Sequence, residues 1–284
     1  MSKFNWRVRE LIFALVRPLF HLGIRATSHV TGKLRPLDES GSPVVLTRGE
    51  REEVPPRRLW VGYLGTSEEY LAEGRADMEA VVSLLAAKGI SHPRVALDLG
   101  CAAGRMTRHF PRTEESEIWG ADISAPHIFW CQRNLPELNF VTVSTAPHLP
   151  FADNYFDFVF CASVFTHITD LADAWLLEIR RVLKPQGHLY ATVQDKVSAE
   201  EMRTTYADVL VPSTIAQLKR LERKHAVSRA DCEMFYFDND PSSRVFYDRD
   251  YITRKWSKWM DVVAYEERFY HFQSAMLLRK SASA

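Results

Sequence analysis

The sequence is poor in cysteine and lacks a cysteine pair of the kind that binds structural zinc. Its four cysteines are far apart along the chain, at Cys101, Cys131, Cys161 and Cys232. A disulfide framework or a zinc cluster needs closely and regularly spaced cysteines. We therefore expect a reduced, cytoplasmic protein without structural zinc.

The chain also lacks an excess of charge of either sign. Lysine plus arginine and aspartate plus glutamate both number 36 among 284 residues, so no overall field attracts nucleic acid. Apolar residues make up 46% and charged residues 25%, which is typical of a globular protein. One enlarged α/β domain can account for this length.

A long uncharged apolar run is absent even from residues 1–30, the least typical part of the chain. Glu10 and Arg17 leave only six uncharged residues between them, too few for a signal peptide. A membrane-spanning helix needs about 20 apolar residues. Apolar residues nevertheless recur there at helical spacing: Phe4, Val8, Leu11, Ile12, Leu15, Val16, Leu19 and Phe20.

Two interpretations of this amino-terminal helix remain open. It packs across the main domain, where it could close over the substrate as a lid, or it makes peripheral contact with an anionic membrane surface. We favour packing. Residues 1–63 are accordingly assigned to an amino-terminal helix and linker.

What the chain does have is a strand–turn–strand unit that ends on an acid. Val95–Leu97 is a short apolar run typical of a buried parallel strand. A turn containing glycine follows at residues 98–104, then an expected helix at 105–110 and a second strand at 117–121, which leads to Asp122. This order is typical of a nucleotide-binding unit, in which the acid accepts hydrogen bonds from ribose hydroxyls.

The turn fits a dinucleotide site poorly. A Gly-x-Gly-x-x-Gly pattern is missing, because only Gly100 and Gly104 occur, with Ala102 between them. Asp98 stands two residues before the first glycine, where a carboxylate suits a cationic amine better than a pyrophosphate. An NAD-dependent Rossmann oxidoreductase is therefore the less favoured alternative.

Here the sequence resembles the class I S-adenosylmethionine-dependent methyltransferases, in particular those that act on small molecules. Their first motif is an acid-x-Gly-x-Gly-x-Gly turn, which Asp98, Gly100 and Gly104 match, with Ala102 at the middle glycine. Three later motifs follow in the family's order and spacing: Leu149-Pro150-Phe151, Phe156-Asp157 and Leu183-Lys184-Pro185-x-Gly187. The resemblance covers residues 64–195 well and residues 245–284 loosely.

The resemblance implies a cofactor, S-adenosyl-L-methionine, and residues that contact it. Asp98 would hold the amino group, Asp122 the ribose hydroxyls, and Ile123 would pack on the adenine. The family's adenine-binding aspartate falls at Thr145, so the backbone of Ala146 is expected to take over that role. The complete set of expected cofactor-binding residues is Asp98, Gly100, Ala102, Gly104, Asp122, Ile123, Thr145, Ala146 and Cys161.

Two residues at strand ends are candidate general bases, His167 after the fourth strand and Asp195 after the fifth. Methyl transfer mostly requires positioning of the acceptor, and a base helps when the acceptor is a hydroxyl. Either residue could instead be structural. His167 and Asp170 lie three residues apart without a further ligand at suitable spacing, so no metal is expected.

The sequence therefore predicts methyl transfer to a small-molecule or sugar-bearing acceptor at oxygen. Nucleic-acid and protein-glutamine amino methyltransferases carry an Asn-Pro-Pro-aromatic tetrapeptide after the fourth strand, where this chain has Cys161-Ala162-Ser163-Val164. That difference argues against such acceptors. A non-catalytic, membrane-associated protein that binds S-adenosylmethionine is a further alternative.

The predicted fold is α/β, with a single doubly wound, mostly parallel, seven-stranded Rossmann-like sheet. An amino-terminal helical extension precedes it, and an insertion follows the fifth strand. We assign residues 64–195 to the cofactor-binding core, 196–250 to a substrate-cap insertion and 251–284 to the closing strands. The remaining expected helices lie at 66–88, 124–134, 170–182 and 214–227, and the remaining strands at 140–143, 155–161, 188–193, 262–269 and 273–278.

Overall fold

The computed structural model describes residues 54–61, 63, 65–205, 233–236 and 244–282. Residues 51–284 form one compact unit. The helix expected within residues 1–30 and the one expected at 214–227 lie outside the described residues. The predictions of a lid or a membrane contact for the amino-terminal helix therefore stay predictions.

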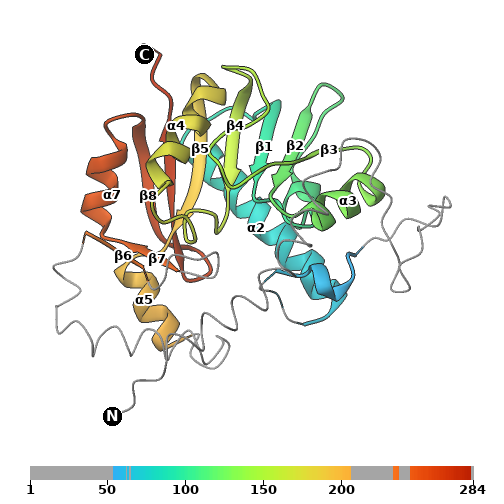
Figure 1. Cartoon of the computed structure of the whole chain (residues 1–284), viewed down its shortest axis with the longest axis horizontal. Helices are drawn as coiled ribbons and strands as arrows, with labels where there is room; N and C mark the ends of the chain where they lie inside the picture. The colour runs from blue at the N-terminus through green and yellow to red at the C-terminus, as the bar shows by residue number, and fades with distance from the viewer. Residues whose placement is uncertain (1–53, 62, 64, 206–232, 237–243, 283–284) are drawn as a thin grey trace, which may run out of the picture. The chain divides into compact units, whose positions relative to one another are not determined.

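The centre of the molecule is a seven-stranded sheet (Figure 1). Five neighbouring strands are parallel, and two further strands join one end through antiparallel pairings, so the predicted mostly parallel Rossmann-like fold is confirmed. The spatial order is β3 (Asn139–Thr142), β2 (Glu117–Asp122), β1 (Val95–Leu99), β4 (Phe156–Cys161), β5 (Leu183–Val193), β9 (Gln273–Arg279) and β8 (Asp261–Tyr270).

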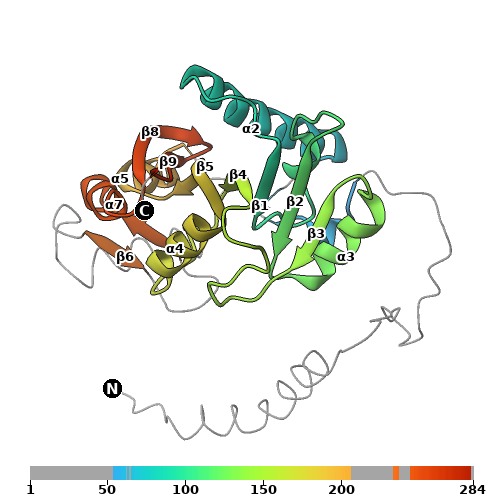
Figure 2. The same ribbon diagram turned by 90° about the horizontal axis from the view of Figure 1, so that it is seen from above.

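Helices cover both faces of this sheet. Figure 2 shows α2 (Ser67–Ala87) and α4 (Ala172–Val182) on opposite sides of β1 and β4. One face packs against α2 and α3 (Ala125–Asn134), and the other against α4 and α7 (Arg249–Trp256). Side chains of one strand alternate between the two cores, because successive residues of a strand point to opposite faces. A strand buried on both faces therefore reads as a continuous apolar run.

Smaller elements lie at the ends of the sheet. The helix α5 (Lys196–Arg203) follows β5 directly, and β6 (Met234–Tyr236) pairs antiparallel with β7 (Val245–Tyr247). Two 3-10 turns complete the described chain, η1 (Arg57–Leu59) and η2 (Thr107–His109). Within the described residues, no helix combines the length and apolar character needed to cross a bilayer.

The helix predicted at 66–88 is confirmed as α2, together with its capping box. The hydroxyl of Thr66 accepts from the Glu69 N–H, and the Glu69 carboxylate accepts from the Thr66 N–H. Gly74 allows a close approach within this helix, since a Cβ there would lie 2.5 Å from the Arg105 carbonyl oxygen. The helix is thereby held against the glycine turn.

Three local predictions were wrong in detail. The segment 105–110 forms only the short turn η2, not a helix. The helix expected at 170–182 begins only at Ala172, after the N-cap residue Leu171, whose side chain makes no capping hydrogen bond. The fifth strand begins at Leu183 rather than at His188, so the motif at residues 183–187 is part of it, with Gln186 at a φ of 64°. The expected closing strands are confirmed as β8 and β9.

Candidate active site

The candidate cofactor site lies at the carboxyl ends of β1 and β2, where the glycine turn folds over the sheet edge. The backbone N–H groups of Gly100 and Cys101 both donate to the carbonyl of Ala121, at 2.7 and 3.1 Å. The turn has positive φ angles at Gly100 (83°), Ala102 (45°) and Gly104 (70°). Ala102 thus takes a left-handed backbone conformation, which glycine adopts readily and which is strained for a residue with a Cβ.

Gly100 is needed for space as well as for backbone conformation. A Cβ at Gly100 would lie 2.5 Å from Cγ2 of Val164, in the loop after β4. Real Cβ atoms do not approach a neighbour so closely. The loop after β4 therefore lies directly over the turn.

Asp98 is a buried carboxylate beneath this turn. One of its oxygens accepts a hydrogen bond from the Thr107 hydroxyl at 2.6 Å. Burial raises the pKa of Asp98 to about 7; the Thr107 hydrogen bond opposes the shift, and the negative charge of Asp122 adds to it. A cationic group placed beside this carboxylate would favour its ionised form.

Asp122 joins the turn to the next helix. Its carboxylate accepts from the Ala102 N–H at 2.8 Å and from the Ser124 N–H at 2.7 Å. Ser124 occupies the N-cap position of α3, but its side chain makes no capping hydrogen bond. Ile123, between them, is 57% exposed, which is unusual for a large apolar residue and leaves its side chain available to a planar ligand.

The other expected cofactor contacts are less well defined by the structure. Thr145 and Ala146 are exposed in the loop after β3, and the Ala146 N–H donates to the Ser144 hydroxyl at 3.2 Å. Cys161 is buried at the end of β4, with its thiol 3.6 Å from the Tyr190 carbonyl oxygen. Burial raises the pKa of the Cys161 thiol, so it stays protonated.

Arg105, directly after the glycine turn, is a further buried charged residue that the sequence did not indicate as functional. Its guanidinium is buried, lies 3.8 Å from the ring centroid of Tyr63, and is hydrogen-bonded to Tyr63, to Asp77 at 2.5 Å and to Tyr270 at 2.8 Å. Its other terminal nitrogen, Nη1, is buried without a hydrogen-bond partner. The position directly after Gly104 was the only sequence signal, and an arginine there does not by itself indicate a ligand.

The two candidate bases differ in their surroundings. His167 is exposed in the loop after β4. Asp195 is buried, and its carboxylate accepts from Ser198 N–H (2.8 Å) and hydroxyl (3.1 Å), from the Tyr265 hydroxyl (2.7 Å) and from the Ser274 hydroxyl (2.5 Å). The Asp195 oxygens are thus occupied by structural hydrogen bonds.

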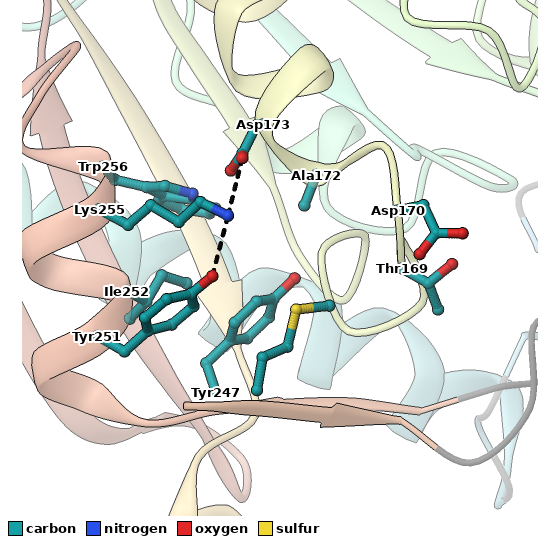
Figure 3. Close-up of a pocket in the computed structure, with 10 residues that line it drawn as sticks. Thr169, Asp170, Ala172, Asp173, Tyr247, Tyr251, Ile252, Lys255 and Trp256 are labelled. Atoms are coloured by element: carbon teal, nitrogen blue, oxygen red, sulfur yellow. Dashed lines mark hydrogen bonds and ion pairs between the residues drawn. The ribbon is translucent and has the colours of Figure 1, made fainter. Parts of the chain in front are cut away.

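A pocket opens between the start of α4, the paired strands β6 and β7, and α7 (Figure 3). Its cavity volume is about 40 Å³, and Lys255 lies at its wall between Asp173 (2.8 Å) and the Tyr251 hydroxyl (2.9 Å). These contacts raise the pKa of Lys255, with the Asp173 hydrogen bond as the largest cause. Part of this wall comes from α7, which follows the segment expected to form the substrate cap.

Comparison with known proteins decides the family. Residues 97–191 match a family described as a methyltransferase domain. This stretch is a methyltransferase domain with the fold of the class I S-adenosylmethionine-dependent methyltransferases. The matched region runs from β1 to β5 and so contains the glycine turn, Asp122 and the strand ends described above.

Relatives of this methyltransferase include enzymes of more than one acceptor type. It is 30% identical over 146 residues to malonyl-[acyl-carrier protein] O-methyltransferase of Geobacter sulfurreducens, covering 50% of this chain and 54% of that protein. It is 34% identical over 106 residues to a ubiquinone/menaquinone biosynthesis C-methyltransferase of Paraburkholderia phymatum, covering 36% and 43%. The chain spans about half the length of the curated relatives it matches.

A solved structure supports the fold. The magnesium protoporphyrin IX methyltransferase of Synechocystis, solved with bound S-adenosylhomocysteine, superimposes with a TM-score of 0.51 and 15% identity. The match covers 79% of this chain and 92% of that one. At this identity the likeness concerns the fold of the methyltransferase and not its acceptor.

Proposed function

We propose that this chain transfers the methyl group of S-adenosyl-L-methionine to an oxygen atom of a small-molecule or sugar-bearing acceptor. The observation that carries the proposal is the pairing of a buried carboxylate, Asp98, with a left-handed turn and a second carboxylate, Asp122, at one sheet edge. When bound, the cofactor supplies an electrophilic methyl group on a sulfonium. The chain then has to bind, orient and shield the reactants.

The residues at this edge fit the cofactor's groups one by one. Asp98 would hold the ammonium group, whose charge offsets the burial that raises the pKa of Asp98. Arg105 would bind the carboxylate through Nη1, the buried atom that has no partner within the protein. Asp122 would accept from the ribose hydroxyls with lone pairs left over from its two backbone hydrogen bonds, and Ile123 would cover the adenine.

The adenine end is the less completely defined part of this proposal. The Ala146 N–H, which is expected to bind the adenine, already donates to the Ser144 hydroxyl. The Ala146 carbonyl or the Thr145 hydroxyl would therefore take part in adenine binding as well. Gly100, Ala102, Gly104 and Cys161 would only line the site.

For the acceptor, we propose His167 as the base that takes the hydroxyl proton during transfer. It lies in the loop after β4, the loop that also covers Gly100 through Val164. Asp195 would position the end of β5 through its four hydrogen bonds and would take no proton.

The experiment that tests this function is calorimetry with S-adenosylhomocysteine and, separately, with NAD. We expect S-adenosylhomocysteine to bind and NAD not to bind. Binding of NAD alone would identify an oxidoreductase and contradict the proposal. Binding of S-adenosylhomocysteine without transfer to any metabolite of the producing cell, followed as a gain of one methylene mass, would point to a non-catalytic binding protein.

His167 can then be tested on the acceptor that this screen identifies. The variant His167→Gln should lower turnover while leaving S-adenosylhomocysteine affinity unchanged. Unchanged turnover would leave positioning alone as the source of catalysis. The cytoplasmic location, the absence of a metal and the cap role of residues 196–250 stay predictions.

A further inference from the structure

Ser163, the second residue after β4, is held in a strained conformation by three hydrogen bonds. Its φ is 60°, in the left-handed region that a residue with a Cβ rarely adopts. Its N–H donates to the Thr192 hydroxyl at 2.7 Å, and its carbonyl accepts from the Thr166 hydroxyl at 2.8 Å. Strain of this kind persists only where surrounding contacts hold it, and it is concentrated at functional sites.

The third contact fixes the direction of the Ser163 hydroxyl. Gln273 Nε2 donates to Ser163 Oγ at 2.8 Å, while Gln273 Oε1 accepts from the Thr192 hydroxyl at 2.6 Å. Ser163 Oγ is therefore an acceptor within this network, and its own proton remains to be donated to another group. Thr192 of β5 and Gln273 of β9 thus hold Ser163, which follows β4, so that its hydroxyl proton is free for a further acceptor.

Gln194, two residues after Thr192, has a side-chain amide that makes no hydrogen bond. Its side chain is fully buried, and neither Nε2 nor Oε1 has a partner. Gln194 directly follows β5, and its backbone carbonyl accepts from the Tyr247 N–H at 2.8 Å. Thr192 pairs with Ala275 and Val193 with Ser274, and this antiparallel register, continued by one residue, puts Gln194 across from Gln273 and on its face of the sheet.

An amide buried without partners costs free energy, and such groups are rare in folded proteins. The cost is removed by a ligand that accepts from Nε2 and donates to Oε1 at the same time. Within the described part of the chain, no ionised side chain is hydrogen-bonded to Ser163, Thr192 or Gln273, and Asp195 is committed to other partners. The site therefore suits an uncharged group.

We propose that Gln194 and Ser163 form a subsite that binds the methyl acceptor through an amide-type edge. The ligand group is a primary or secondary amide, a lactam or an imide, with an N–H donor beside a carbonyl acceptor. The Gln194 amide pairs with both, and the Ser163 hydroxyl donates to a carbonyl of the same molecule. This inference rests on the proposed methyl transfer, since it places an acceptor next to the cofactor edge.

The test uses the full chain saturated with S-adenosylhomocysteine and a matched pair of probes. 3-Hydroxybenzamide and 3-hydroxyacetophenone share their ring, hydroxyl and carbonyl, but only the first has the N–H donor. Ligand-detected NMR titration should give about tenfold tighter binding of the amide, the usual effect of leaving a buried acceptor unpaired. In Gln194→Met the preference should vanish while S-adenosylhomocysteine affinity is kept.

Two further variants keep the test decisive. Thr253→Val removes another buried hydroxyl without a partner, on α7, and should leave the amide preference intact. Ser163→Ala should weaken binding of both probes. This variant replaces Gln194→Met as the test of the subsite if Gln194→Met does not fold. An amide preference that persists in Gln194→Met, or equal binding of both probes to the unmodified protein, would overturn the subsite alone. Failure of S-adenosylhomocysteine to bind would overturn the methyl-transfer function as well.

Discussion

The two halves of the sheet edge are built in contrasting ways. At the ends of β1 and β2 the site is charged, with Asp98, Asp122 and the Arg105 guanidinium around a strained turn, all within one short stretch of chain. At the ends of β4, β5 and β9 it is made of hydroxyls and amides. There Thr192 and Gln273, far apart in sequence, are 2.6 Å apart in space.

This difference bears on what each half can recognise. A contiguous turn with fixed carboxylates suits a ligand of constant structure, such as a cofactor. A network assembled from three strands changes whenever any of them changes, and so it can be adapted to different acceptors on one fold. The predictions below test whether the charged half binds the cofactor and whether the polar half is largely independent of it.

The largest effect is expected for Gly100→Val. The new side chain would require a β-branched residue at a φ of 83° and would collide with Val164, so S-adenosylhomocysteine affinity should fall more than about 100-fold. Gly89→Val is the matched control, because Gly89 has a φ of 70° but open space around a Cβ. Calorimetry that finds normal affinity in Gly100→Val would show that the turn is not the cofactor pocket.

Asp195→Ala should separate structure from catalysis in the polar half. The substitution leaves the hydroxyls of Tyr265 and Ser274 without their acceptor, and we expect a loss of about 3 kcal/mol in the free energy of unfolding. Thermal melting should fall by roughly 6–12 °C for a domain of this size. Asp261→Ala, at an exposed ion pair, should melt like the unmodified protein. A normal melting temperature with lost turnover would restore Asp195 as a base.

Asp122→Ala should weaken S-adenosylhomocysteine binding by about 1–3 kcal/mol, measured by calorimetry. The variant loses the acceptor for the Ala102 and Ser124 N–H groups and, under the proposal, the one for the ribose. Asp122→Asn keeps one carbonyl oxygen and should show a smaller loss. Unchanged affinity in Asp122→Ala would remove this residue from the site.

The smallest effect is a pH dependence that originates at Asp98. Its pKa of about 7 means that the unliganded protein is mostly protonated there at pH 6, whereas the ammonium group requires the ionised form. Binding then releases a proton, so affinity should rise by up to about tenfold from pH 6 to 8 and level off above. Asp98→Asn should abolish this slope, and a slope that survives in it would assign the dependence to another group.

The raised pKa of Asp98 also affects stability. As the pH rises, the free energy of unfolding should fall, whereas the affinity for S-adenosylhomocysteine should rise. The folded protein holds the Asp98 proton more tightly than the unfolded chain, whose pKa is near the ordinary value. The contribution of Asp98 to stability is therefore largest at low pH and declines as the pH rises towards about 7. Bound S-adenosylhomocysteine should reduce this decline.

Much of the fold and of the cofactor half could be predicted from the sequence because the signals are local. The capping box at Thr66, the apolar run before Asp98 and the acid at the end of β2 each act through neighbours in the chain. The prediction of a helix at 105–110 was wrong because non-local contacts act on this segment. There the buried Arg105 is engaged by Tyr63, Asp77 and Tyr270 from distant segments, and only a 3-10 turn forms.

The sequence by itself determined the succession of strands along the chain, the glycine turn and the two acids, Asp98 and Asp122. These features depend on local conformation and periodicity. Only the tertiary structure decided which polar groups find partners. The Asp195 carboxylate is hydrogen-bonded by Ser198, Tyr265 and Ser274, whereas the side-chain amide of Gln194 has no partner, although the two residues are adjacent in the chain. Neighbouring side chains of an extended segment point in opposite directions, and what each one meets depends on elements that fold from far along the chain.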